Sequence, residues 1–157
     1  MGNKKSDVKA KNEYIKILEN KGYEKAHVSK APADITAEKN GTKYYFEIKM
    51  TKQKESYFGA ATFTEWEEAF KNPSNYTFVI AKTDENEESF DFTELSPAEF
   101  MSYCTIPPMK VYFNYDLLEK KNKRSSKKSK SVPLTKENFT KLNGVYKSLK
   151  GNTDNET

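Results

Sequence analysis

Two carboxylates and a lysine occur near one another in the first third of the chain, at Asp34, Glu47 and Lys49. Two neighbouring carboxylates form an all-oxygen site, which favours Mg²⁺ or Mn²⁺ over zinc. A lysine beside such a metal can position an attacking water or stabilise charge on a phosphorane-like transition state. The metal itself acidifies its bound water. These residue types together are suited to hydrolysing a phosphodiester.

The Glu-x-Lys spacing occurs three times in the sequence, so the tripeptide alone does not identify a site. Glu19–Lys21 lies at the end of a predicted helix, and Glu119–Lys121 enters a basic run. Glu47–Lys49 lies within a strong strand, after a hairpin whose first strand carries an acid. The alternative is that this pair is only the polar face of a half-exposed strand, because alternating strands have such a face.

The elements around this pair explain how the three residues could meet. The segment 43–51 alternates in polarity, which predicts a strand on which Glu47 and Lys49 share a face. A second strand is expected over 33–38, and Asn40-Gly41 between the two predicts a tight hairpin turn. The hairpin would lay the acid of the first strand beside the pair on the second.

Apolar periodicity and turn residues predict helices and strands in the rest of the chain. The expected helices cover 7–21, 64–71, a short segment from Ser96 and 136–150, and the other expected strands cover 23–29, 76–82, 89–92 and 109–115. A capping box from Thr64 to Glu67 is expected to start the second helix. The order predicts an α/β domain with a mixed central sheet.

Length and composition limit the class of protein. The 157 residues, 18.1 kDa, suit one domain, which we place at 1–150, with a basic loop at 120–131 and a flexible tail at 151–157. One cysteine and one histidine exclude a disulfide framework and a metal site rich in these residues. No segment has the apolar length of a membrane helix, and the start lacks a secretory signal. We therefore expect a cytoplasmic protein without a membrane partner.

Charge is unevenly distributed along the chain despite a net charge of only +4. The segment 84–99 carries acids without a base, whereas 120–130 carries bases without an acid. Such asymmetry can orient a protein on a polyanion, although charge runs are often only solvated loops. Lysine dominates over arginine, which suits phosphate contact more than base reading.

Two segments, 32–35 (Pro-Ala-Asp-Ile) and 45–49 (Tyr-Phe-Glu-Ile-Lys), resemble the signature of the PD-(D/E)xK nuclease superfamily. Ala33 separates the Pro from the Asp that give the superfamily its name. The segments 13–18 and 21–24 resemble that family's first helix and its glycine stop. The downstream part, 58–79, is similar to the Mrr-like branch and to the NO VEIN C-terminal domain. The resemblance covers roughly residues 8–82.

The resemblance implies a restriction-endonuclease-like fold, with helices flanking the sheet, and Mg²⁺-dependent cleavage of DNA, with Mn²⁺ as a substitute. It implies that Asp34 and Glu47 hold the metal and that the Ile48 carbonyl completes its shell. Lys49 would be the catalytic lysine. Glu13, on the first helix, matches an acid that many members use as an additional metal ligand, and its alternative is a solvated helix glutamate.

Nucleic-acid contacts are expected from one set of polar and basic residues: Gln53, Lys52, Lys123, Arg124, Lys127 and Lys128. Gln53 also fits the Gln-x-x-x-Tyr pattern of the RecB-like branch. DNA is the expected partner, with RNA as an alternative, and cleavage of a duplex would favour a homodimer. The competing hypotheses are a non-catalytic nucleic-acid-binding module and a protein-interaction module that uses the acidic segment 84–99.

Overall fold

The computed structural model describes residues 4–106, 110–111 and 132–153. It divides into two compact units, residues 1–105 and 106–157. The helices and strands are α1 (Lys4–Asn20), β1 (Glu24–Val28), β2 (Ile35–Lys39), β3 (Thr42–Thr51), α2 (Phe63–Lys71), β4 (Tyr76–Thr83), β5 (Phe90–Leu95), α3 (Pro97–Met101) and α4 (Lys136–Thr153).

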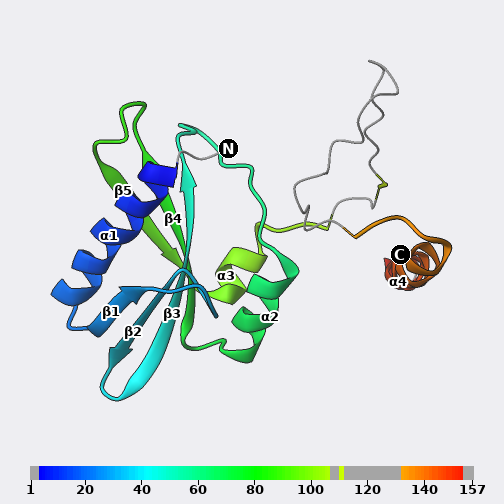
Figure 1. The fold of residues 1–157 in the computed structure, drawn as a ribbon, viewed down its shortest axis with the longest axis horizontal. Coiled ribbons are helices and arrows are strands. Elements are labelled where there is room, and N and C mark those ends of the chain that lie inside the picture. Colours follow the sequence, from blue (N-terminus) through cyan, green and yellow to red (C-terminus); the bar gives the residue numbers. More distant parts are fainter. Residues whose placement is uncertain (1–3, 107–109, 112–131, 154–157) are drawn as a thin grey trace, which may run out of the picture. The chain divides into compact units, whose positions relative to one another are not determined.

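A five-stranded mixed sheet in the order β1-β2-β3-β4-β5 forms the centre of the first unit (Figure 1). Neighbouring strands are antiparallel except β3 and β4, which are parallel and are connected through α2. Helix α1 covers one face of the sheet, and α2 and α3 cover the other (Figure 1). This arrangement confirms the predicted α/β fold with a mixed central sheet and is consistent with a restriction-endonuclease-like fold.

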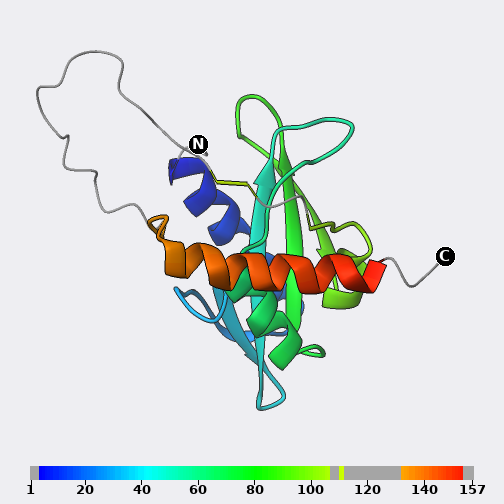
Figure 2. The same cartoon turned by 90° about the vertical axis from the view of Figure 1, so that its right-hand side faces the viewer.

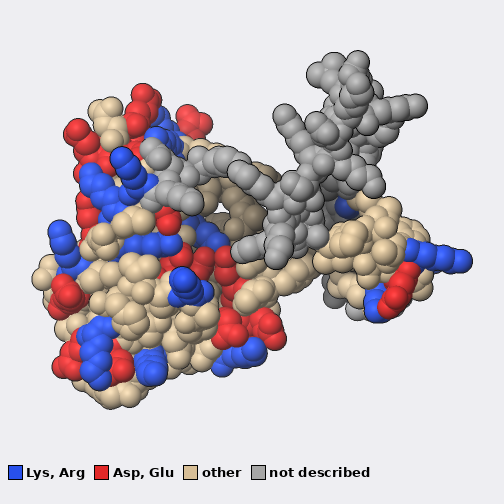
Figure 3. Space-filling model, in the orientation of Figure 1, with Lys and Arg blue, Asp and Glu red and all other residues tan. Residues whose placement is uncertain are grey.

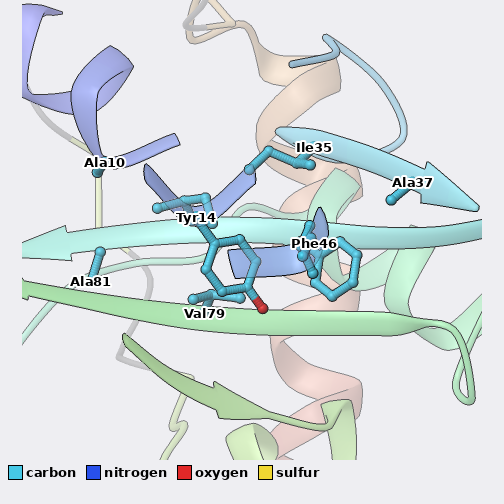
Figure 4. Packing of buried hydrophobic residues seen from close by; sticks show 9 residues of the cluster. Ala10, Tyr14, Ile35, Ala37, Phe46, Val79 and Ala81 are labelled. Atoms are coloured by element: carbon cyan, nitrogen blue, oxygen red, sulfur yellow. The ribbon is translucent and has the colours of Figure 1, made fainter. Parts of the chain in front are cut away.

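Helix α1 is held to the sheet by an apolar stripe. Ala10, Tyr14 and Leu18 recur at a spacing of four residues and are fully buried. They pack against residues of the central strands, among them Phe46 and Val79 (Figure 4). The helix ends before Gly22, whose φ of +81° is the left-handed conformation that glycine adopts at helix ends.

The hairpin between β2 and β3 has the two-residue loop that the sequence predicts. Asn40 and Gly41 both have positive φ, +52° and +76°. Positive φ at both central positions matches the twist of the flanking strands, and Asn-Gly adopts it at low cost. The loop sets the register in which Ile35 faces Phe46.

The opposite face of the sheet is packed by aromatic rings. Tyr76 and Phe78 of β4 are buried there together with Ala69 of α2. The Trp66 ring lies 5.0 Å from that of Phe78, measured between ring centroids, and packs against Phe100 of α3. The two helices on this face are therefore joined through one aromatic cluster.

The capping box that starts α2 is two residues earlier than predicted. It joins Thr62 and Glu65, not Thr64 and Glu67, so that prediction was wrong. Both pairs fit the same Thr-x-x-Glu pattern. Glu65 also contacts a lysine of β3, whereas Glu67 pairs with Lys71 on the helix surface. The observed box therefore differs from the predicted one in that its acid also makes a tertiary contact with the sheet.

The second unit contributes α4, which Figure 2 shows as one continuous helix coloured orange to red. It begins at Lys136, as predicted, and continues to Thr153. Most of the strand predicted over 109–115 and all of the basic loop 120–131 lie outside the described residues, and Lys110 and Val111 are not in a strand. Among the helices that the structure describes, none combines the length and apolar character needed to cross a membrane.

Candidate active site

Asp34 lies immediately before β2, where the pairing of β2 with β3 stops. The last registered pair at this end joins Ile35 and Phe46. Beyond it, Asp34 Oδ2 accepts a hydrogen bond of 3.1 Å from the backbone N–H of Ile48. In an antiparallel ladder, the N–H and C=O of one residue point toward the same neighbour. The Ile48 carbonyl therefore lies on the same side of β3 as Asp34.

Glu47 and Lys49 share the face of β3 that α2 and α3 cover. Lys49 Nζ lies 3.1 Å from Glu47 Oε1 and 2.6 Å from Glu65 Oε2. The Glu47 and Lys49 side chains are only 10% and 13% exposed. The lysine thus bridges an acid of its own strand and an acid of α2 in a setting with little solvent.

Glu65 is a functional candidate that was not predicted from the sequence. Its Oε2 accepts a hydrogen bond from the Thr62 backbone N–H at 2.9 Å and also contacts Lys49 Nζ. Its own N–H donates to Thr62 Oγ1. The same carboxylate therefore caps the first turn of α2 and forms an ion pair with Lys49 of β3. The Thr62-x-x-Glu65 pattern was the available sequence signal, but it indicates a helix start and not a contact with Lys49.

The buried acids of the site repel each other. Burial, followed by the nearby charge of Asp34, raises the pKa of Glu47 to about 7. The positive charge of Lys49 opposes this rise without cancelling it. A divalent cation beside Glu47 would offset this repulsion and favour the ionised form of the carboxyl.

The lysine and the acid of α2 stabilise each other's charge. Burial by itself would lower the pKa of Lys49, but its hydrogen bond to Glu65 and the charge of Glu47 raise it above its usual value. Burial would likewise raise the pKa of Glu65, yet the hydrogen bonds from Lys49 and Thr62 lower it. Lys49 is accordingly a firmly charged ammonium group at neutral pH.

A contact from α1 to Asp34 was not predicted. Lys11 Nζ lies 2.7 Å from Asp34 Oδ1 and 2.8 Å from Asp7 Oδ2, and its side chain is only 14% exposed. Although burial would lower the pKa of Lys11, the two acids raise it. Nothing in the sequence marks Lys11 among the many lysines of this helix.

Glu13 is placed differently from what the family resemblance implies. It lies on α1 two residues after Lys11, and residues two apart on a helix point to nearly opposite sides. Among the described residues, Glu13 does not join Asp34 and Glu47 in a group of three carboxylates arranged to hold a metal ion. The structure brings Asp34, Glu47, Lys49 and the Ile48 backbone together without Glu13 in that group.

The residues expected to contact nucleic acid are only partly described. Gln53 accepts a hydrogen bond from the Phe58 backbone N–H, so it orders the connection between β3 and α2. Lys52 forms an ion pair of 2.5 Å with Glu87. The other members of the set, Lys123, Arg124, Lys127 and Lys128, lie outside the described residues.

A groove of about 420 Å³ lies where β3 and β4 end, lined by Lys52, Lys54 and Lys82 together with acids of the β4–β5 turn. Neither Glu47 nor Lys49 lines it. On the face drawn in Figure 3, lysines and acids of the first unit are interspersed. The groove is thus a mixed-charge surface separate from the three residues that could do chemistry.

Comparison with protein families gives a match that covers most of the first unit. Residues 7–93 match the family model for the C-terminal domain of Protein NO VEIN, which spans more than half of the sequence. The chain belongs to the NO VEIN C-terminal family. Comparison with curated proteins and with solved structures finds no match.

The NO VEIN C-terminal domain is related to the restriction-endonuclease-like fold, in agreement with the mixed sheet described above. The matched segment runs from α1 into β5 and contains Asp34, Glu47, Lys49 and Glu65. Lys11 and Asp7 also lie within it. All side chains of the candidate site therefore belong to the NO VEIN C-terminal segment and none to the second unit.

The donor atoms of this NO VEIN C-terminal domain fit a hard cation with few protein ligands. Within residues 4–106, 110–111 and 132–153, no group of three or more His, Cys, Asp or Glu side chains is arranged to hold a metal ion. Mg²⁺ does not require such a group, because it usually keeps several waters and binds one or two carboxylates plus substrate phosphates. The carboxylates of Asp34 and Glu47 with the Ile48 carbonyl match that requirement.

Proposed function

We propose that this protein is a metal-dependent nuclease of the PD-(D/E)xK type that hydrolyses phosphodiester bonds in DNA. One observation carries the proposal: a hairpin of two strands brings the acid of Asp34 to the backbone of Ile48, beside buried Glu47, with the Lys49 ammonium in contact. An ordinary surface ion pair is exposed to solvent and contributes little to stability. The burial of Glu47 and Lys49 distinguishes this pair from such a surface pair.

Each residue of the site has a role that its position supports. Asp34, Glu47 and the Ile48 carbonyl would hold the cation. The Lys49 ammonium, 3.1 Å from Glu47, would hold the attacking water by hydrogen bonding or stabilise charge on the phosphoryl oxygens. Glu65 would keep Lys49 charged and directed into the site. The bound metal would acidify water and neutralise the phosphate's charge.

The test is cleavage of supercoiled plasmid by the purified chain with Mg²⁺, with Mn²⁺ and with a chelator. Cleavage is expected only with a metal. Lys49→Ala should lower the rate by about 100-fold or more, as should Asp34→Asn. Lys43→Ala is the matched control, because Lys43 lies on the same strand and face but is exposed. Equal cleavage by wild type and Lys49→Ala would refute the assignment.

The products report on substrate and assembly. One site cuts one strand, so nicked circles would indicate independent copies, whereas direct linearisation would indicate a homodimer. The same assay on single-stranded DNA and on RNA distinguishes the alternative substrates. Linearisation that depends on protein concentration would support the dimer.

A non-catalytic module with the same fold is the second candidate, since both oxygens of Asp34 already have partners, Lys11 and the Ile48 N–H. In that case the acids would be structural. Asp34→Asn would then leave DNA affinity unchanged, and no metal would produce cleavage. The protein-interaction alternative predicts instead a protein partner that is lost when the acids of segment 84–99 are neutralised.

A further inference from the structure

Lys11 is held near the proposed metal site in a way that the other lysines of α1 are not. Its ammonium lies between two carboxylates, 2.7 Å from Asp34 Oδ1 and 2.8 Å from Asp7 Oδ2. Lys9 and Lys16 on the same helix are exposed. Lys11 is thus a mostly buried cation on one of the two acids assigned to the metal.

The position of this ammonium conflicts with a divalent cation on the same oxygen. Asp34 Oδ2 accepts a hydrogen bond from the Ile48 backbone N–H, so Oδ1 is the oxygen that faces a cation. Oδ1 is also the atom that Lys11 contacts. Two cations on one carboxylate oxygen repel each other strongly where solvent is scarce.

We propose that Lys11 is the resident counter-ion of Asp34, which a divalent cation must displace, and that Asp7 retains the displaced ammonium. This inference rests on the metal site assigned above. Asp7 lies one helical turn before Lys11 and is already in contact with it, so the ammonium can leave Asp34 without losing its other partner. Helix α1 would thereby tune how readily the site takes up metal.

The experiment is calorimetric titration of the full-length chain with Mn²⁺, without nucleic acid. Lys11→Met should bind Mn²⁺ about tenfold more tightly than wild type, a scale typical of residues that contact metal ligands. Lys16→Met is the matched control, because it removes the same charge from an exposed position of α1 and should change affinity little. Lys11→Arg keeps the charge and should resemble wild type.

Asp7 supplies a second, independent readout. Asp7→Asn leaves Lys11 with Asp34 as its remaining carboxylate, so it should weaken Mn²⁺ binding in the wild-type background. In the Lys11→Met background the same change should have much less effect. This difference between backgrounds measures coupling between the two residues, which a general change in charge would not produce. Circular dichroism of each variant confirms that it is folded.

The outcomes separate the two proposals. If Lys11→Met and Lys16→Met bind Mn²⁺ with equal affinity, or Lys11→Met binds more weakly, the counter-ion role is refuted while the metal site stands. If neither wild type nor Lys11→Met binds Mn²⁺ at millimolar concentration, both the metal site and the counter-ion role are refuted. Loss of binding in Glu47→Gln shows that the titrated ion occupies the assigned site.

Discussion

Glu47 is the residue whose environment most clearly departs from that of a surface acid. It is 7% exposed, and it faces Asp34, Lys49 and Glu65. Burial and the neighbouring acids make its ionised form costly, which explains a pKa of about 7. Below about pH 7 the metal-free folded protein therefore favours the protonated form of this carboxyl, and a bound cation would favour the ionised form.

Compared with Glu47→Gln, the metal-free wild-type protein should consequently lose stability as pH rises. The folded state holds the Glu47 proton more firmly than the unfolded chain, whose pKa is near 4.5, so this contribution is complete below pH 4.5 and lost as pH passes about 7. Between pH 5 and pH 8 the loss, relative to Glu47→Gln, should be on the order of 3 kcal/mol. Urea unfolding of both proteins in the presence of a chelator measures it, and parallel pH profiles would contradict it.

Two buried tyrosines offer a matched pair for testing hydrogen bonds. Tyr14 and Tyr76 are 0% and 1% exposed. The Tyr14 hydroxyl donates to Glu94 at 2.7 Å, whereas the Tyr76 hydroxyl has no partner among the described residues. Tyr14→Phe should lower the free energy of unfolding by about 2 kcal/mol, because the lost bond is to a charged acceptor.

Tyr76→Phe should be neutral or stabilising, because it removes a buried polar atom that lacks a partner. Denaturant unfolding of both variants gives the comparison. A larger loss for Tyr76→Phe than for Tyr14→Phe would show that the Tyr76 hydroxyl has a partner, such as an ordered water, that stabilises the fold.

Among the secondary-structure elements, α2 and α3 begin with the same capping motif but in different surroundings. Thr62 with Glu65, and Ser96 with Glu99, each form a complete capping box. Only the first acid also contacts Lys49. A comparison of variants at the two helix starts therefore distinguishes the stability that capping contributes from any effect on the site.

Thr62→Ala and Ser96→Ala should each lower the free energy of unfolding by about 1 kcal/mol, since each removes one cap. Only Thr62→Ala should also reduce plasmid cleavage, by about tenfold, because it loosens the acid that contacts the Lys49 ammonium, the proposed catalytic group. Cleavage is measured where both variants are fully folded. Equal cleavage by the two variants would mean that the helix start does not position Lys49.

For the molecule as a whole, the first unit contains the sheet, its helices and the family match. All residues of the candidate site lie before Thr105, where that unit ends. We expect a chain of residues 1–105 to fold cooperatively, with a melting temperature within about 5 °C of the full chain. The fluorescence of Trp66 reports on packing against Phe78. Failure of this fragment to fold would instead support the single domain over 1–150 predicted from the sequence.

The basic segment 120–131 is expected to act on affinity and not on chemistry. Its lysines and Arg124 would contact phosphates and release counterions. Replacing the segment by Gly and Ser of equal length should weaken DNA binding and reduce the slope of log affinity against log salt by at least about 1. Fluorescence anisotropy at several salt concentrations measures this slope. An unchanged slope would show that the segment does not contact DNA.

The central strands and three of the site residues could be predicted because their positions depend on local rules. Alternation with a period of two puts Glu47 and Lys49 on one face, and Asn40-Gly41 closes a two-residue turn. The tight turn joins two strands that follow each other in the sequence, so the same rules place Asp34 beside the second strand, where it accepts a hydrogen bond from the Ile48 backbone. The mixed α/β fold follows from the order of elements in the same way.

Lys11 and Glu65 could not be found by such rules, because each reaches the site from a helix packed on a different face of the sheet. The rotation of a helix on a sheet depends on how its whole apolar stripe fits, here Ala10, Tyr14 and Leu18 against the strands. That packing directs Lys11 toward Asp34. Local patterns therefore predicted that Asp34, Glu47 and Lys49 lie together, and three-dimensional packing determined which other charges surround them.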